Sequence, residues 1–397
     1  MTSIPEQTTS ARVGTDIMPI QSTLPATSRV RLFFLDHLRA ALTILVVLHH
    51  LAVIYGAAAV FYYVEPPAQS DQLTPLVLGL FVLLNQSYFM GAFFLISGYF
   101  TPGSFDRKGP KAFYQDRLLR LGIPLVAFVL ILSPLASIGL YQTPASFPHL
   151  TLPFTWQQVP ALLSVGPLWF AALLLLFDLG YVFWRQARRT HGQPTEHASR
   201  PPSYWMVGLF ILVLAAASYL LRIVVPLGAT VLIFPSLAYL PQYLSFFILG
   251  AIAVRRHWFE TIPGSMGITG LVGALLATVV LAPLALSGGA AFLGSGSMQS
   301  AAYALWDSIF SVGICLALLT MFRRCFNRQS RFGRFLSQHA FTVYIIHIPV
   351  IVLLALAIRG IHLEPLLKFG LAALIGVPLC FALAALVRKL PGASKIL

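Results

Sequence analysis

Charged residues are scarce in this chain. Of its 397 residues only 10% are Asp, Glu, Lys or Arg, whereas 58% are hydrophobic and the mean hydropathy is +0.82. A soluble domain carries about 25% charged residues because its surface must face water. The composition therefore excludes a soluble globular protein and predicts an all-α, polytopic membrane protein whose helices are embedded in the lipid bilayer.

Cysteine and long polar segments are scarce as well. Cys315 and Cys380 fall in predicted membrane spans and Cys325 in a predicted cytoplasmic loop, so neither a disulfide framework nor a metal site is expected. The longest polar connection, residues 185–203, is too short for a separate soluble module. Residues 1–31 are polar and lack the apolar run of a cleaved signal peptide. We expect 1–31 to be a disordered cytoplasmic tail and 32–390 to be a single integral membrane domain.

About ten apolar stretches have the roughly 20 residues that a helix needs to cross the hydrocarbon core. They are residues 33–55, 76–99, 121–141, 162–184, 204–224, 236–254, 264–286, 301–322, 340–358 and 366–388. The second stretch could be broken at Asn85-Gln86-Ser87, and residues 225–236 could form a short interfacial piece. The pattern predicts a bundle of about ten transmembrane helices.

The formal net charge of +14 could suggest a nucleic-acid partner, but the placement of the basic residues argues against one. Lys and Arg concentrate in alternate connections, and we expect the intervening loops to hold only Arg222, Arg359 and Lys368. This is the positive-inside pattern, which predicts that both termini are cytoplasmic. Most of these cations are then topology signals that lie near anionic lipid.

The stretch LDHLRAALTILVVLHHL, residues 35–51, places polar groups in an apolar helix. Arg39 and His50 share one helix face and lie roughly 16 Å apart along the axis, with Asp36 one turn before Arg39. His49 lies about 100° away and is expected to point elsewhere. Arg39 could hold an anion near the cytoplasm while His50 exchanges a proton deeper in the membrane. The alternative is a histidine that bonds a neighbouring helix, with Arg39 as a topology anchor.

A second stretch, residues 91–125, joins one span to the next through a basic loop. Arg117 and Arg120 are one turn apart and could present two guanidinium groups to one phosphate. Ser97-Gly98 allows a close backbone approach within the membrane. The alternative makes the arginines cytoplasmic anchors and Ser97-Gly98 a helix-packing notch.

Two further stretches carry candidate residues. Trp169 lies at a membrane boundary, where an aromatic belt is the ordinary explanation. Asp178 is an acid within an apolar span and needs a partner. Tyr344 and His347 are one helical turn apart, and this second intramembrane histidine could complete a proton path or pin two helices together.

Five segments in order resemble the acyltransferase-3 family of integral membrane acyltransferases over about residues 32–360. They are FLDHLRAALTILVVLHH, FFLISGYF with DRLLRLGIPL, GPLWFAALLL, PQYLSFFILGAIAVRRHWFETIP and LSQHAFTVYIIHIPVI. The resemblance implies an O-acyltransferase of the bacterial cytoplasmic (inner) membrane. Such an enzyme moves an acyl group, often acetyl or succinyl, from cytoplasmic acyl-CoA to a glycan or small-molecule hydroxyl. Acyl-CoA is then a donor substrate, and no bound cofactor is expected.

The resemblance also implies roles for individual residues. His50 would be the essential histidine and Arg39 its partner in an Arg-x10-His pattern, with Asp36 beside it. Arg117 and Arg120 would engage the donor, and we group Ser97 and Trp169 with them. In this hypothesis a neutral His50 accepts the hydroxyl proton as the acceptor attacks the thioester.

Two other functions stay open at this point. A proton-coupled transporter or exporter would use His50, His347 and Asp178 as a relay. A structural subunit of a polysaccharide assembly complex would need none of them for chemistry.

Overall fold

The computed structural model describes residues 2–3, 32–57, 59–152, 155–188 and 200–397. The chain divides into two units, Met1–Leu32 and Phe33–Leu397. The tail expected at residues 1–31 lies almost wholly outside the described residues, so that prediction stays untested. Everything below concerns the second unit.

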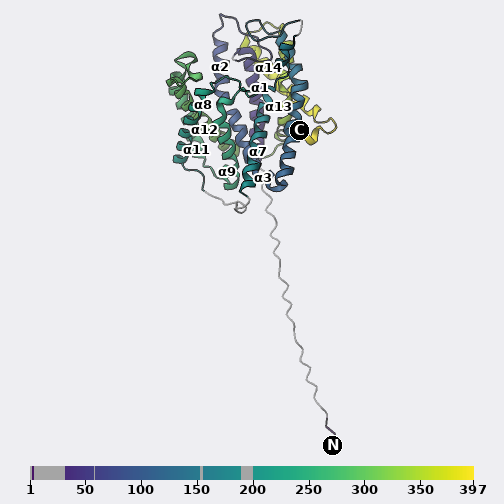
Figure 1. The fold of residues 1–397 in the computed structure, drawn as a ribbon, viewed down its shortest axis with the longest axis vertical. Coiled ribbons are helices and arrows are strands. Elements are labelled where there is room, and N and C mark those ends of the chain that lie inside the picture. The colour runs from purple at the N-terminus through teal and green to yellow at the C-terminus, as the bar shows by residue number, and fades with distance from the viewer. Residues whose placement is uncertain (1, 4–31, 58, 153–154, 189–199) are drawn as a thin grey trace. The chain divides into compact units, whose positions relative to one another are not determined.

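The described residues of this unit are helical, and the only β-type pairing among them is an isolated bridge between Val231 and Phe234. Turns around this bridge occupy residues 225–236. Figure 1 shows the long helices packed side by side as a bundle. Its long helices are α1 (Phe33–Gly56), α2 (Leu73–Gln86), α3 (Phe89–Arg117), α7 (Trp169–Ala187), α8 (Tyr204–Val224), α9 (Leu240–Arg256), α11 (Gly264–Leu286), α12 (Met298–Cys325), α13 (Arg331–Ala357) and α14 (Pro365–Val387).

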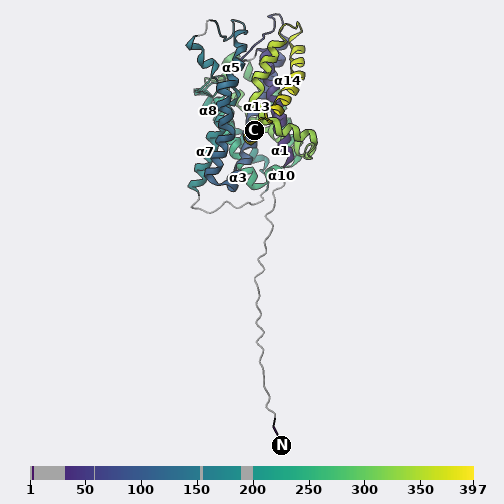
Figure 2. The ribbon, with the colours of Figure 1, turned by 90° about the vertical axis from the view of Figure 1, so that its right-hand side faces the viewer.

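Nine helical stretches of the described chain are long and apolar enough to cross a membrane. One of them, Leu73–Tyr141, runs for 69 residues and is interrupted inside α3 at Gly109, where φ is 75° and ψ is 169°. Glycine adopts this left-handed φ without Cβ strain, and Pro110 can then begin the next helical segment. The chain reverses here, as the positions of α2, α3 and α5 (Ser133–Ala136) show in Figures 1 and 2. When the stretch Leu73–Tyr141 is divided at Gly109, the described chain has about ten spans, as predicted.

The predicted break near residue 86 is confirmed. Helix α2 ends at Gln86 and α3 begins at Phe89. The side chain of Gln242 on α9 donates to the carbonyl oxygen of Ser87 at 2.6 Å. A freed backbone group inside a membrane bundle is tolerated when a neighbouring helix satisfies it, and Gln242 does so here.

Glycines set the closest helix contacts. A Cβ added at Gly98 of α3 would overlap the carbonyl oxygen of Phe247 on α9, and one at Gly250 of α9 would overlap that of Leu95 on α3. Such small-residue contacts replace the hydrophobic effect as a source of helix packing in lipid. Gly98 therefore forms the helix-packing notch that the alternative interpretation of Ser97-Gly98 predicts.

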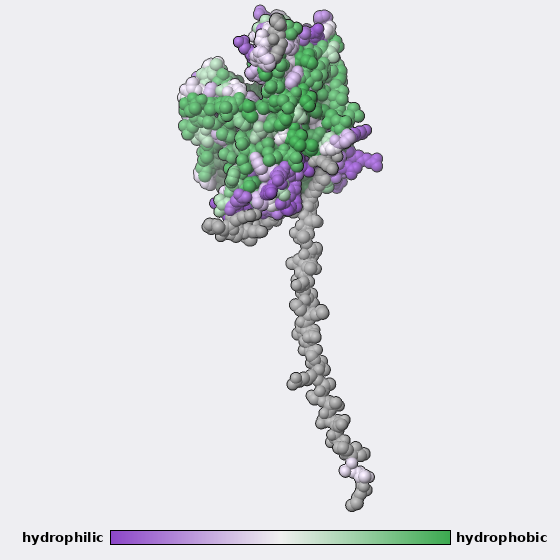
Figure 3. Space-filling model, turned by 45° about the vertical axis from the view of Figure 1, so that its right-hand side comes forward, coloured by the Kyte–Doolittle hydropathy of each residue, from purple (hydrophilic) through white to green (hydrophobic). Residues whose placement is uncertain are grey.

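The surface of the helical unit is mostly apolar. Figure 3 shows a broad hydrophobic belt, with hydrophilic residues gathered at its two ends. At one end, called the basic end below, Arg185 of α7 and Arg255 of α9 both pair with Asp106 of α3. At the other, the cavity end, the described parts of the connections 57–72, 142–165 and 225–236 come together around a cavity. The positive-inside pattern predicts that the basic end is cytoplasmic.

Two basic residues that were expected in loops at the cavity end lie elsewhere. Arg222 belongs to the last turn of α8 and is 0% exposed, and Lys368 belongs to α14 and is 3% exposed. Each has a carboxylate partner, Asp307 for Arg222 and Glu65 for Lys368. The predicted spans 204–224 and 366–388 contain both residues and are confirmed, whereas counting them as loop charges was wrong. A buried partner lets a cation stay inside an apolar span.

Candidate functional site

The centre of the site is a pair of histidines from two helices. His50 of α1 and His347 of α13 approach with 3.1 Å between Nδ1 of His50 and Nε2 of His347. The Nδ1 atom of His347 lies 2.8 Å from the carbonyl oxygen of Tyr344, and the Nδ1 atom of His50 lies 2.9 Å from that of Val46. His347 is fully buried, whereas His50 is partly exposed.

These hydrogen-bond partners indicate which ring nitrogen carries the hydrogen in each histidine when both rings are neutral. A carbonyl oxygen can only accept, so Nδ1 of His347 carries its hydrogen and Nε2 of that ring is an acceptor. The hydrogen between the two rings then belongs to Nδ1 of His50. Nε2 of His50 consequently keeps its lone pair, which is the arrangement a general base needs.

Aromatic side chains hold the ring of His50 from two sides. Phe61 stacks on it with ring centroids 5.1 Å apart and an interplanar angle of 20°. His49 meets it edge-on at 5.4 Å and stacks on Phe89 of α3 at 4.9 Å. His49 therefore faces α3 rather than the His50–His347 pair, as its helical offset predicts.

His50 lines a cavity of about 710 Å³ at the cavity end. Typical small-molecule sites measure about 300–1,000 Å³, so the space fits a ligand of drug or sugar size. Most of its wall comes from the connections between helices. The lining residues are His50, Val60, Phe61, Tyr62, Leu140, Pro148, His149, Leu150, Pro160, Leu163, Ser164, Val165, Gly166, Pro167, Trp169, Thr230, Leu232, Ile233, Pro235 and Ile348.

Tyr344 connects the histidine pair to the cavity wall. Its carbonyl accepts from His347, and its hydroxyl donates to the carbonyl of Pro167, a lining residue. Trp169 lines the same wall, with its ring centroid 5.5 Å from that of Tyr243. The structure thus brings His50, His347, Tyr344 and Trp169 together, and Trp169 lies away from the arginines with which it was grouped.

The other predicted residues lie on α1, α3, α7 and the π-helical turn that follows α3. Asp36 and Arg39 form an ion pair on α1, with 3.3 Å between Nη2 and Oδ1. Asp178 has the partner that its burial requires, since Nε of Arg117 lies 3.2 Å from its Oδ2 atom. Thr101 also donates to Asp178, at 3.1 Å.

Arg117 and Arg120 face different carboxylates. Arg120 is exposed and pairs with Asp116 at 3.2 Å, whereas Arg117 turns inward to Asp178. Arg117 directly precedes a π-helical turn, residues 118–122, that contains Arg120 and widens the helix locally. Ser97 is half-buried in α3, and its carbonyl accepts from Thr101 at 3.0 Å. Donor binding by Arg117, Arg120 and Ser97 stays a prediction.

Sequence reasoning missed the ion pair that fixes the loop over His50. Lys368 donates to the carboxylate of Glu65 and, at 3.1 Å, to the carbonyl oxygen of Arg359. Tyr63 donates to the other carboxylate oxygen of Glu65 at 3.3 Å, and burial raises the pKa of Tyr63 to about 12. Phe61 lies in the same loop, so this pair holds the residue that stacks on His50.

A second missed pair is buried beside the cavity-end aromatics. Nη2 of Arg222 lies 2.7 Å from Oδ2 of Asp307, and both side chains are buried. The guanidinium lies over the rings of Tyr239 and Tyr303, at 4.9 and 5.3 Å from their centroids. The sequence carried a signal for this ion pair, because Asp307 is an acid within the predicted span 301–322 and needs a partner there.

Comparison with known proteins decides the family. A family model described as "Acyltransferase domain" matches residues 32–385. The chain belongs to this acyltransferase family. As a multi-pass membrane member of it, the chain carries the histidine pair in the region that the match covers, on α1 and α13.

Named relatives point the same way. "Glucans biosynthesis protein C" of Salmonella paratyphi B is 28% identical over 344 residues, which cover 81% of this chain and 82% of that protein. The protein of the same name from Salmonella typhi is 27% identical over 341 residues, with the same coverage. No solved structure matches the chain.

Proposed function

We propose that this acyltransferase is an O-acyltransferase of the bacterial cytoplasmic membrane. It moves an acetyl or succinyl group from cytoplasmic acyl-CoA to a hydroxyl of a glycan on the other side. The observation that carries the proposal is the His50–His347 pair beside a cavity of about 710 Å³. The name of the Salmonella relatives, which refers to glucans, supports a glycan as the acceptor.

In the proposed reaction His50 is the general base. Its Nε2 takes the proton from the acceptor hydroxyl as that oxygen attacks the thioester carbonyl carbon. The new carbon–oxygen bond forms, the carbon–sulfur bond breaks, and the proton passes from His50 to the leaving thiolate. His347 acts as a positioning residue, because its Nε2 accepts from Nδ1 of His50 both before and after His50 gains the second proton.

The two substrates approach from opposite ends. The acceptor occupies the cavity, where Phe61 and Trp169 offer aromatic surfaces. The donor enters from the basic end, where the guanidinium groups of Arg39, Arg117 and Arg120 can bind CoA phosphates. Ser97 lies further into the bundle on α3. Arg39 and His50 are on the same helix and roughly 16 Å apart along its axis, so a group that extends from a bound phosphate can reach the base.

The test measures thiol release and labelled product together. Detergent-purified protein is given radiolabelled acetyl-CoA or succinyl-CoA with a glucan pool, as wild type, His50→Gln and His49→Phe. His50→Gln should lose about 10²–10⁴-fold in rate, the usual contribution of a general base. His49→Phe keeps the stacking on Phe89 and should stay near wild type.

The same assay can reject the proposal. No donor consumption by folded wild-type protein with either acyl-CoA would rule out acyl transfer from these donors and favour the proton-coupled transporter. Equal losses in His50→Gln and His49→Phe would mean that the region is needed for packing rather than for proton transfer.

A further inference from the structure

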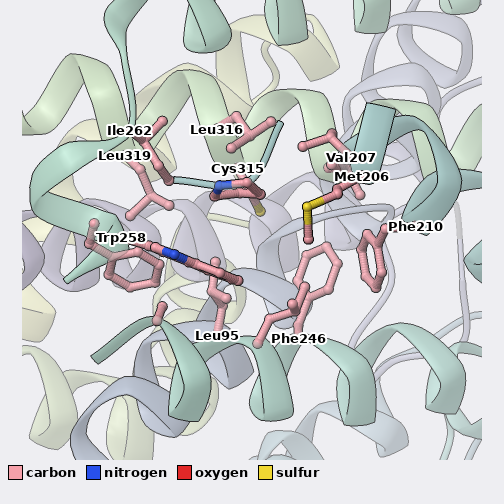
Figure 4. Close-up of a pocket in the computed structure, with 15 residues that line it drawn as sticks. Leu95, Met206, Val207, Phe210, Phe246, Trp258, Ile262, Cys315, Leu316 and Leu319 are labelled. Atoms are coloured by element: carbon pink, nitrogen blue, oxygen red, sulfur yellow. The ribbon is translucent and has the colours of Figure 1, made fainter. Parts of the chain in front are cut away.

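An apolar slot of about 290 Å³ lies between α3, α8, α9, α10 (Trp258–Thr261) and α12. It is separate from the cavity at His50, because the two share no lining residue. In Figure 4, Met206, Phe210 and Phe246 point toward the space that Leu316 and Cys315 border from the other side. The lining residues are Leu95, Pro202, Met206, Val207, Phe210, Phe246, Leu249, Ala253, Trp258, Phe259, Ile262, Val312, Cys315, Leu316 and Leu319.

The slot runs along the membrane normal from the basic end toward the middle of the bundle. Its lining residues on α12 extend from Val312 to Leu319, and those on α9 from Phe246 to Ala253. Seven helical steps correspond to about 10 Å. Met206, in the first turn of α8, lines the slot and is 51% exposed, so the slot reaches the apolar surface of the bundle at α8. An elongated apolar space that opens to the bilayer suits a hydrocarbon chain.

A cation stands where the slot meets the basic end. The guanidinium of Arg256 lies 5.5 Å from the ring centroid of Trp258, a lining residue, and its side chain is exposed. Arg256 has no carboxylate partner among the described residues, whereas its neighbour Arg255 pairs with Asp106 at 2.6 Å. Arg323 donates to the carbonyls of Phe259 and Ile262, which fixes the turn that forms this mouth.

We infer that the slot binds one acyl chain of an anionic glycerophospholipid of the bilayer, whose phosphate lies at Arg256. The charge complementarity selects this occupant, since a basic site between membrane helices near the cytoplasmic surface attracts anionic headgroups. The chain buries its methylene groups against the apolar lining, and the phosphate meets a cation for which the described part of the chain offers no acidic partner. The inference does not depend on acyl transfer.

The test of the slot counts bound lipids. Detergent-stripped protein is titrated with phosphatidylglycerol or phosphatidylcholine of identical chains and followed by native mass spectrometry. Wild type should bind one phosphatidylglycerol about fivefold more tightly than phosphatidylcholine, as expected for one added cation at the surface. Val207→Trp fills the slot and should lose this tightest site for both lipids. Leu209→Trp, on the outward face of the same helix and 47% exposed, should keep it.

The test of the phosphate contact compares two exposed arginines, Arg256 beside the slot residue Trp258 and Arg188 beside Trp184, which does not line the slot. Arg256→Gln should lower phosphatidylglycerol affinity to the level of phosphatidylcholine. Arg188→Gln removes another exposed guanidinium at the basic end, 5.3 Å from the ring centroid of Trp184, and should change nothing. A thermal melt of each variant checks the fold, and Leu316→Trp replaces Val207→Trp if that variant unfolds.

Three results would overturn the inference. Undiminished phosphatidylglycerol binding by folded slot-filled protein would place the lipid elsewhere. Equal losses in Arg256→Gln and Arg188→Gln would reduce the effect to general surface charge. Tighter binding of palmitoyl-CoA than of phosphatidylglycerol to the wild type, lost in Val207→Trp, would assign the slot to a long-chain thioester instead.

Discussion

The two ends of the bundle use charge in different ways. At the basic end many cations lie at the surface and share few acids, as Arg185 and Arg255 share Asp106. At the cavity end charges are few, but Arg222 and Lys368 are buried, each against one carboxylate. Exposed pairs contribute little individually, whereas a buried charge that loses its partner is costly. The first end therefore sets topology, and the second fixes the position of the residues around the cavity.

The largest effect, on the free energy of unfolding, is expected when a buried ion pair is broken. Arg222→Met leaves the Asp307 carboxylate inside the bundle without its cation and should lower the free energy of unfolding by about 3–5 kcal/mol. Arg255→Met at the basic end should cost about 1 kcal/mol or less. Thermal unfolding in detergent measures both, and Arg222→Met/Asp307→Leu should recover most of the loss. Similar melting shifts at the two ends would contradict the comparison.

The next effect separates catalysis from donor binding. His347→Leu removes the acceptor for Nδ1 of His50 and should lower kcat by about 10–100-fold. His347→Gln keeps a carbonyl oxygen that can accept, so its loss should be smaller. Arg120→Gln at the basic end should instead raise KM for acyl-CoA and leave kcat nearly unchanged. Steady-state kinetics with both substrates distinguish these outcomes, and equal losses in the Leu and Gln variants would indicate packing alone.

A smaller effect concerns the loop over His50. Glu65→Gln weakens the hold of Lys368 on the loop that carries Phe61. Loss of one charged hydrogen bond is worth about 1.5 kcal/mol, so KM for the acceptor should rise about tenfold while KM for the donor stays constant. Glu364→Gln changes an exposed carboxylate at the same end and serves as the control. A matching rise with Glu364→Gln would remove the role assigned to the Glu65–Lys368 pair.

The smallest effect lies among exposed charges of the basic end. Asp116→Asn breaks the contacts to Lys108 at 2.7 Å and to Arg120 at 3.2 Å. Because all three groups are solvent-accessible, stability should change by less than about 1 kcal/mol. The change should shrink further in high salt, which screens such pairs. Melting curves at low and high ionic strength test this, and a large salt-independent shift would show that the network is structural.

Hydropathy predicted the spans well because membrane crossing is a local property. The predicted spans agree with the long helices to within a few residues at most ends, and the interruption before Phe89 was anticipated from Asn85-Gln86-Ser87. His50 was also singled out, since an ionisable residue in an apolar run is costly unless it has a use, and its role as a base stays a prediction.

Contacts between helices could not be predicted in the same way. His50 and His347 are 297 residues apart, and their contact depends on how α1 and α13 rotate against each other. Arg222 lies within the predicted span 204–224 but was counted with the loop charges, because nothing in the sequence shows that Asp307 on α12 pairs with it inside the bundle. Phe61 lies in a loop without periodicity, so nothing in the sequence signals that it covers His50.

One residue, Tyr344, connects the His50–His347 pair to the wall of the cavity. Its backbone steers the ring of His347, and its hydroxyl is anchored to the peptide of Pro167. If the cavity holds the acceptor as proposed, a ligand that displaces this stretch of wall also displaces the residue whose carbonyl orients His347. We then expect the alignment of His50, and the protection of a bound thioester from water, to differ between the empty and the filled cavity.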